Sequence, residues 1–217
     1  MSLPAADGTT VVWDLGNVLI PWDRTNALTA ALGDAGQARR LCATVFDMEL
    51  NALVDAASDE TTLLESVELV RPGSSWVVKA YLEHFEASLG PVIDASAALV
   101  QELTDNRIRC VGLSNFSALT FTGMAERYPI LTRLEGTLIS GDVGITKPDP
   151  AIYRLCEQRF GLDPDHVTFI DDNPANVHAA LALGWDAVQF TDATALRAQL
   201  VSRSLPVAPD DDGSTIG

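Results

Sequence analysis

Short apolar runs that alternate with helical patterns constrain the fold of this chain more than any other feature. Such runs, rich in β-branched residues, lie at residues 11–20, 108–113, 134–140, 167–170 and 187–190. Helical periodicity fills much of the chain between them, at about residues 93–105, 117–127, 149–160, 174–183 and 192–202. Strands that alternate with helices form a parallel sheet with helices on both faces. The sequence therefore predicts an α/β fold.

Residues 21–91 interrupt this alternation. The interval is about 70 residues long, rich in Ala, Leu and Glu, and has helical periodicity with almost no strand pattern. A helical insert directly after the first strand would lie over the carboxyl ends of the strands, where open α/β sheets bind ligands. We therefore predict a core at residues 9–20 and 92–203, a helical cap at 21–91 and a flexible acidic tail at 204–217.

The composition limits the partners of the chain. Its 217 residues include 30 Asp and Glu against 14 Lys and Arg, for a net charge of -16. This excess argues against nucleic acid or an anionic membrane as a partner, because both reward clustered cations. The sequence has no leader-like start and no apolar run of the ~18 residues that a membrane span needs, so we expect a cytoplasmic protein. A monomer and a homodimer both remain open.

Polar residues follow each predicted core strand at the point where a catalytic group would be useful. They are Asp14, Ser114-Asn115, Lys147 and Asp171-Asp172. Alone, each position could be a turn, a helix N-cap or a solvated surface residue. Because the carboxyl ends of parallel strands meet at one edge of a sheet, we expect all four positions to share one cleft.

Such a cluster holds more negative charge than one lysine can neutralise. Three neighbouring carboxylates raise one another's pKa unless a cation joins them. Mg²⁺ prefers a few carboxylates and leaves positions for water and a substrate phosphate. Beside that ion, Asp14 is a plausible nucleophile toward phosphorus. Lys147, Ser114 and backbone amides would hold the phosphoryl oxygens.

These residues match the motifs of a known family. D-L-G-N-V at 14–18, L-S-N at 113–115, K-P at 147–148 and D-D-N-P-A-N at 171–176 resemble the haloacid dehalogenase superfamily of aspartyl-nucleophile hydrolases, over about residues 9–200. The insert resembles the helical C1 cap of subfamily I. The chain is most similar to the D-L-G-N-V phosphatase branch, which includes α-D-glucose-1-phosphate phosphatases. The resemblance implies a Rossmann-like core and a Mg²⁺-dependent phosphatase that acts on a small phosphorylated metabolite.

The resemblance also implies which residues bind the metal. Asp14 would be the nucleophile and a ligand, and Gly16 would contribute its backbone carbonyl. Asp172 would be the third protein ligand, with Asp171 either a further ligand or an acid behind the ligands. Asn176 lies one helical turn beyond Asp172 and would orient it.

The same resemblance assigns the phosphate-binding residues. Ser114 and Asn115 would bind the phosphoryl group, together with the loop at Gly16 and Asn17. Lys147 would bridge the phosphoryl group to Asp14.

The chain departs from the family pattern at Gly16, where most phosphatases of the superfamily have a second Asp. That Asp protonates the leaving oxygen, and such help is worth about 10² to 10⁴ in rate. Asp23, Asp47 or Glu49 of the insert could replace it, the leaving group could need little protonation, or the protein could be weak or inactive. We favour the second explanation, which predicts a preference for anomeric or aryl phosphates.

Two other functions remain open. A 2-haloacid dehalogenase would use Asp14 to attack carbon without a metal, although the branch that does so lacks an intact acidic pair like Asp171-Asp172. A non-catalytic binding protein would explain Gly16 but not the retained acids and Lys147. For substrate contacts, Trp22 and Arg24 follow the first strand closely enough to be candidates.

Overall fold

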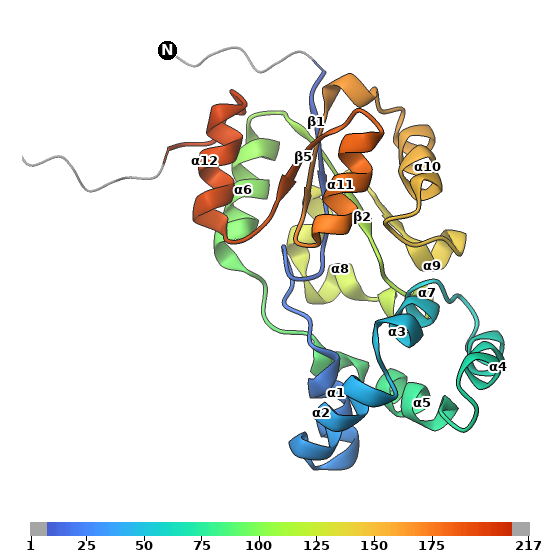
Figure 1. The fold of residues 1–217 in the computed structure, drawn as a ribbon. Helices are drawn as coiled ribbons and strands as arrows, with labels where there is room; N and C mark the ends of the chain where they lie inside the picture. The colour runs from blue at the N-terminus through green and yellow to red at the C-terminus, as the bar shows by residue number, and fades with distance from the viewer. Residues whose placement is uncertain (1–7, 210–217) are drawn as a thin grey trace, which may run out of the picture.

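Five parallel strands form the centre of the molecule (Figure 1), in a computed structural model that describes residues 8–209. They are β1 (Thr10–Trp13), β2 (Arg109–Ser114), β3 (Thr137–Ile139), β4 (Val167–Asp171) and β5 (Asp186–Gln189). Their order in the sheet is β3-β2-β1-β4-β5, and every neighbouring pair is parallel. The predicted α/β fold with a parallel, Rossmann-like sheet is confirmed.

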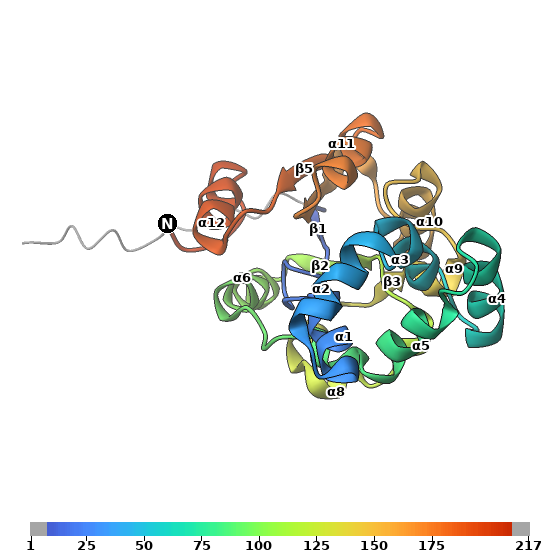
Figure 2. The same ribbon diagram turned by 60° about the horizontal axis from the view of Figure 1, so that its bottom comes forward.

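Helices cover both faces of this sheet (Figures 1 and 2). Val11 and Trp13 of β1 pack in the same apolar cluster as α6 (Asp94–Asp105) and α12 (Ala193–Ser202). Val12, between them, packs on the other face with α10 (Pro150–Phe160) and α11 (Pro174–Ala182). Successive side chains of a strand point to opposite faces, so a strand buried on both sides must be apolar throughout.

The strand order places a switch in chain direction beside β1. From β1 the chain adds β2 and β3 on one side, and then crosses to add β4 and β5 on the other. Trp13 is in register with Gly112 of β2 and with Ile170 of β4, so the three strands end at nearly the same level. Open α/β sheets bind ligands at the carboxyl ends of the strands beside such a switch.

The first apolar run is only partly a strand. β1 ends at Trp13, and residues 15–20 fold back into a tight turn, in which the Leu19 and Ile20 amides both donate to the Leu15 carbonyl at 2.9 Å. Leu15, Val18 and Leu19 are nevertheless fully buried. The apolar pattern at residues 11–20 therefore reported burial rather than one continuous strand.

The helix predicted at residues 117–127 is two short helices, α7 (Ala118–Phe121) and α8 (Met124–Arg127). Thr122 has an extended backbone, and Gly123 adopts a positive φ of 82°. Glycine takes this left-handed conformation without the steric penalty that other residues meet. The break at Gly123 turns the chain toward the 3₁₀-helix η2 (Pro129–Arg133).

The predicted start of the flexible tail at residue 204 is wrong, because the chain still packs on the core there. Leu205 and Val207 are only 5% and 7% exposed. The Ala208 amide donates to Glu102 of α6 at 2.9 Å, and Arg197 of α12 donates to the Ala208 carbonyl at 2.7 Å. Residues 204–208 therefore pack against the core, while 210–217 lie outside the described residues.

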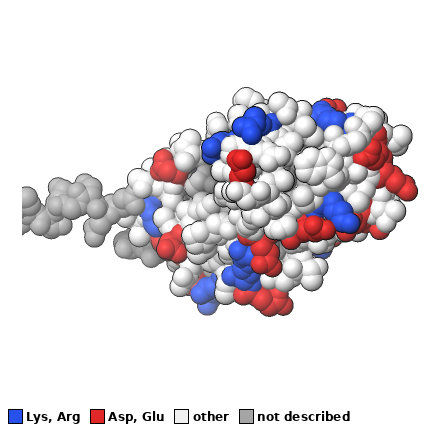
Figure 3. Space-filling view, turned by 90° about the horizontal axis from the view of Figure 1, so that it is seen from below, with Lys and Arg blue, Asp and Glu red and all other residues white. Residues whose placement is uncertain are grey.

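The insert is helical, as predicted, and lies beyond the carboxyl ends of the strands (Figures 1 and 2). It contains α1 (Arg24–Leu32), α2 (Ala35–Thr44), α3 (Met48–Asp55), α4 (Glu60–Val70), α5 (Ser75–Glu83) and η1 (Phe85–Ser88). Four of its helices are N-capped by Asp23, Asp34, Asp47 and Asp59, whose carboxylates accept backbone amides of the first turn. On the side seen in Figure 3, acidic and basic residues are interspersed. None of the described helices is long and apolar enough to cross a bilayer.

Hydrogen bonds fasten the end of α3 to the core. Ser140 Oγ donates to the Asp55 carbonyl at 2.6 Å. Ser117 Oγ and the Ala118 amide both donate to the Ala57 carbonyl at 3.0 Å. Gly141 permits this approach, because a Cβ there would lie 2.1 Å from the Ala118 nitrogen and 2.9 Å from the Ala57 oxygen. This contact fixes α3 relative to the sheet.

Gly141→Ala should therefore destabilise the protein. The added methyl group meets backbone on both sides, and overpacking of this kind costs about 1–3 kcal/mol of unfolding free energy. Thermal denaturation measures the change. Gly36→Ala is the matched control, because its Cβ meets only the ends of the Asp34 and Arg40 side chains and a Gly in a helix is itself unfavourable. Equal melting temperatures for Gly141→Ala and the wild type would contradict the close approach.

Candidate active site

A buried lysine joins three strand ends at the switch beside β1. Lys147 Nζ lies 2.8 Å from Asp14 Oδ1 and 2.7 Å from Asp171 Oδ2, and donates to the Leu113 carbonyl at 2.7 Å. Lys147 is 3% exposed and Asp171 is fully buried. An ammonium group has three N–H donors, and these contacts account for all of them. The ends of β1, β2 and β4 therefore meet at one nitrogen.

Side-chain amides hold this lysine and its partner acid in place. Asn115 accepts the Lys147 backbone amide at 2.8 Å and donates to the Lys147 carbonyl at 2.9 Å. Asn176 Nδ2 donates to both oxygens of Asp171 at 3.0 Å, and the Asn173 amide donates to Asp171 Oδ1 at 2.8 Å. The prediction that Asn176 orients Asp172 is wrong, because its amide group holds Asp171. The Asn115 side chain holds the Lys147 backbone rather than standing free for a phosphoryl group.

Asp172 faces the cavity from the loop after β4. It is partly buried, and burial followed by the charge of Asp171 raises its pKa, while a hydrogen bond from Asn17 opposes the rise. Asn17 adopts a positive φ of 56°, a region that Asn tolerates better than most residues. Its Oδ1 accepts the Trp22 amide at 2.9 Å. Asn17 therefore braces both Asp172 and the chain that leads into the insert.

The three acids form a site with unbalanced negative charge. Asp14, Asp171 and Asp172 each offer a carboxylate oxygen within 4.8 Å of the others. Burial, followed by the charges of Asp171 and Asp172, raises the pKa of Asp14 to about 7 against the opposing effect of Lys147. Burial alone would lower the pKa of Lys147, but Asp14 and Asp171 raise it overall. Hard oxygen donors at this spacing, with one ammonium for three acids, suit Mg²⁺.

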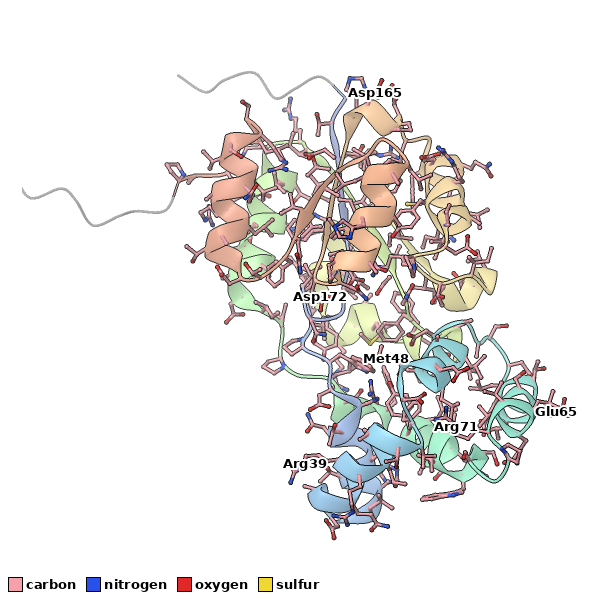
Figure 4. The ribbon with its side chains drawn as sticks, in the orientation of Figure 1. Arg39, Met48, Glu65, Arg71, Asp165 and Asp172 are labelled. Atoms are coloured by element: carbon pink, nitrogen blue, oxygen red, sulfur yellow. The ribbon has the colours of Figure 1, made fainter. Side chains whose placement is uncertain are left out.

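A cavity above these acids is lined by both the core and the insert. Figure 4 shows Asp172 at the end of the sheet nearest the insert, Met48 of α3 below it, and Asp165 at the opposite end. The lining includes Asp14, Gly16, Asn17, Ser114, Asn115, Lys147, Asp172 and Asn176 from the core. The insert and the chain leading to it contribute Trp22, Met48, Asn51, Val54, Asp55, Tyr81, Phe85 and Leu89. Of the residues that the four motifs assigned to the site, Asp171 alone lies behind the cavity wall.

The acids that the sequence offered in place of the missing Asp do not line this cavity. Asp23 caps α1, and Asp47 caps α3 and pairs with Arg71 at 2.8 Å. Glu49 also pairs with Arg71, at 3.3 Å. These carboxylates stabilise the insert, so that set of candidates is wrong.

The two substrate-contact candidates near the first strand differ in position. Trp22 lines the cavity, and its indole N–H donates to the Tyr81 hydroxyl at 3.0 Å. Arg24 lies outside the lining and donates to the Met48 sulfur at 2.8 Å and the Cys42 carbonyl at 3.4 Å. Arg24 therefore acts within the insert.

Sequence reasoning missed two polar residues of α3 in the cavity wall. Asn51 and Asp55 are four positions apart and share a helix face with Val54. Asn51 Nδ2 donates to Asp55 Oδ2 at 2.8 Å, while Asn51 Oδ1 is buried without a partner among the described residues. The available signal was a pair of polar residues on the apolar side of a predicted helix.

A family model of haloacid dehalogenase-like hydrolases matches residues 9–184. The chain belongs to this family. The match covers the whole sheet except β5 and includes the insert.

Several known proteins are similar to this hydrolase. Flavin mononucleotide hydrolase 1 of Arabidopsis thaliana is 26% identical over 116 residues, which cover 54% of this chain and 47% of that protein. Sesquiterpene phosphatase astK of Aspergillus oryzae is 24% identical over 188 residues, covering 85% and 90%. The chain spans less than half the length of several other curated relatives.

Solved structures share the fold. HAD family enzyme bt-2542 of Bacteroides thetaiotaomicron, crystallised with magnesium and inorganic phosphate, is 19% identical, with a TM-score of 0.65 over 85% of this chain and 94% of that one. At this identity the likeness concerns the fold alone.

We expect Mg²⁺ to raise the melting temperature of this hydrolase by a few degrees at ten times its Kd. The shift should be larger at pH 8 than at pH 5.5, because a raised pKa near 7 leaves Asp14 protonated at the lower pH. Without metal, protonation of Asp14 stabilises the folded protein, because its pKa is higher there than in the unfolded chain. This stabilisation is present at low pH and is lost as pH rises through about 7.

Differential scanning fluorimetry checks this shift. Asp172→Asn should remove it. Asp165→Asn should keep it, because Asp165 is an exposed residue at the far end of β4 (Figure 4). A shift that persists in Asp172→Asn would contradict the site.

Proposed function

We propose that this hydrolase is a Mg²⁺-dependent phosphatase that cleaves a small phosphomonoester through an aspartyl-phosphate on Asp14. One observation carries the proposal: Asp14 faces a cavity, 2.8 Å from a buried ammonium group and within 4.8 Å of two further acids. A carboxylate so placed can attack phosphorus and form a covalent intermediate.

The chain's own residues have distinct tasks in this reaction. Asp14 supplies the attacking oxygen, and Lys147 neutralises charge beside it. Ser114 is 1% exposed and lines the cavity near Asp14, where its hydroxyl can donate to a phosphoryl oxygen. Bound Mg²⁺, held by Asp14, Asp172 and the Gly16 carbonyl, would neutralise charge that develops on the phosphoryl group.

The relatives support a phosphatase. A flavin mononucleotide hydrolase and a sesquiterpene phosphatase are similar in sequence, and a structural neighbour was crystallised with magnesium and phosphate. An L-2-haloacid dehalogenase of Xanthobacter autotrophicus shares the fold at a TM-score of 0.61. The acidic cluster at Asp14, Asp171 and Asp172 favours phosphate chemistry over dehalogenation, which needs no metal. We further propose that residues 21–91 act as a cap over the cavity and that the protein works in the cytoplasm, as a monomer or homodimer.

Asp14→Asn should lower kcat for p-nitrophenyl phosphate on the order of 10⁴-fold or more, because an amide cannot form the intermediate. EDTA should abolish wild-type turnover and excess Mg²⁺ should restore it. Release of p-nitrophenol measures both effects, and Asp165→Asn is the control. Chloride release from chloroacetate in the presence of EDTA would instead identify a dehalogenase.

The cavity lining favours a substrate whose leaving group is apolar. Leu15, Ile20, Trp22, Phe85 and Phe116 form much of the wall. The missing acid at Gly16 predicted a preference for anomeric or aryl phosphates, and an anomeric sugar phosphate carries hydroxyls that need several hydrogen-bonding partners when they leave water. Apolar walls instead stabilise a hydrocarbon group as its surface leaves water.

We therefore expect kcat/KM for phenyl phosphate or a prenyl monophosphate to exceed that for glucose 1-phosphate by about tenfold or more. Burial of each CH₂ group is worth about 0.8 kcal/mol, so two such groups already supply this factor. Steady-state kinetics with Mg²⁺ measures the ratio. Glucose 1-phosphate as the better substrate would contradict this assignment and leave the phosphatase function intact.

A further inference from the structure

The position of Gly16 leaves the reaction without the usual acid, and the cavity contains one other candidate. Among the described residues, only three acids line it: Asp14, Asp172 and Asp55. Asp14 and Asp172 belong to the charged cluster at the strand ends. We propose that Asp55 of α3 is the general acid and base of this hydrolase, an inference that rests on the proposed phosphatase function.

Local contacts orient the Asp55 carboxyl group toward a defined task. Asn51 Nδ2 donates to Oδ2 at 2.8 Å, and Oδ1 makes no hydrogen bond with any described residue. Oδ1 therefore has no competing partner when a ligand occupies the cavity that Asp55 lines. The buried, unpartnered Oδ1 of Asn51 beside it offers a further acceptor to a hydroxyl group or water.

The backbone of Asp55 is also fixed relative to Asp14. Ser140, which follows β3 directly, donates to the Asp55 carbonyl at 2.6 Å, and Ala57 is tied to Ser117 and Ala118 at 3.0 Å. β3 lies beside β2, which in turn lies beside β1 and Asp14. These contacts tie the end of α3 to the sheet that carries Asp14, so the acid and the nucleophile keep a defined relation while α3 is docked, as proton transfer requires.

The surroundings of Asp55 suit proton transfer near neutral pH. Burial, followed by the charge of Asp14, raises its pKa to about 8. Lys147, Asn51 and Arg24 oppose this rise. The raised pKa favours the protonated carboxyl group that general acid catalysis needs.

The proton balance closes over two steps. Asp14 attacks phosphorus, the bond to the leaving oxygen breaks with its electron pair on that oxygen, and Asp55 transfers its proton there to give the alcohol. Water then attacks the aspartyl-phosphate, and the Asp55 carboxylate takes a proton from it. The bond from phosphorus to Asp14 breaks, phosphate leaves, and Asp55 is again protonated.

The test compares leaving groups. Asp55→Asn should lower kcat/KM about 10² to 10⁴-fold for benzyl phosphate, whose alkoxide needs a proton as it leaves. The loss of kcat/KM for p-nitrophenyl phosphate should be below about tenfold, because nitrophenolate leaves as a stable anion and the later water step, common to both substrates, does not enter kcat/KM. A variant that merely disturbs the site would lose activity equally on both substrates.

Three further variants sharpen the comparison. Glu49→Gln, on the same helix but exposed and outside the cavity, should match the wild type on both substrates. Asp55→Glu should retain more benzyl phosphate activity than Asp55→Asn. Gly16→Asp should raise the benzyl phosphate activity of Asp55→Asn at least tenfold, because it supplies a carboxyl group at position 16. The site has room for it, since a Cβ at Gly16 meets nothing within 4 Å.

The outcomes separate this inference from the proposed function. An undiminished Mg²⁺ thermal shift in Asp55→Asn shows that the variant folds with its metal site intact. Equal losses on both substrates, or full activity of Asp55→Asn on benzyl phosphate, would overturn the role of Asp55 while wild-type turnover upholds the phosphatase. No Mg²⁺-dependent turnover of either substrate by the wild type would overturn both.

Discussion

The organisation of this protein depends on one buried ammonium group. Lys147 Nζ contacts Asp14, Asp171 and the Leu113 carbonyl at 2.7–2.8 Å. Removing a charge from water costs several kcal/mol, and only close partners offset that penalty. The lysine must therefore be held firmly, and Asn115 binds both polar groups of its backbone. The buried ammonium group and the carboxylates of Asp14 and Asp171 stabilise one another, and the Leu113 carbonyl of β2 accepts the remaining N–H. Three strand ends therefore meet at Lys147.

Lys147 does not neutralise all the negative charge of this ion cluster, and the remaining charge makes the cluster a reactive site. Asp172 adds a third acid, so charge remains uncompensated after Lys147 is counted, and the pKa of Asp14 rises to about 7. A protein that needed only stability would replace such a cluster with apolar residues at little loss. The cluster also sits beside the strand switch, where the chain diverges to either side of β1 and leaves room for a ligand.

The sequence predicted the core of the site better than its walls, for a physical reason. Asp14 directly follows β1 and Asp171 ends β4, so the parallel sheet brings these two acids together. Lys147 lies eight residues beyond the end of β3 and reaches them because Asn115 holds its backbone. Asp55 has no such local signal, because its place in the cavity depends on contacts such as that with Ser140, 85 residues away. Burial patterns also misled where tertiary contacts decide: residues 15–20 are buried in a turn, and residues 204–208 pack on α6 and α12.

A general acid at Asp55 of the insert, rather than at position 16 after β1, depends on a different part of the structure for its position. A side chain at position 16 would lie in the site whenever the sheet is folded, whereas one at Asp55 is in place only while α3 is docked. The docking contacts involve backbone carbonyls of Asp55 and Ala57, with donors at Ser117, Ala118 and Ser140 of the core. They are therefore independent of the side chain at position 55, so the carboxyl group can be removed without releasing α3. Proton transfer by the Asp55 side chain and docking of the insert through the Asp55 and Ala57 carbonyls are therefore separable in this hydrolase, although both involve residues 55–57 at the end of α3.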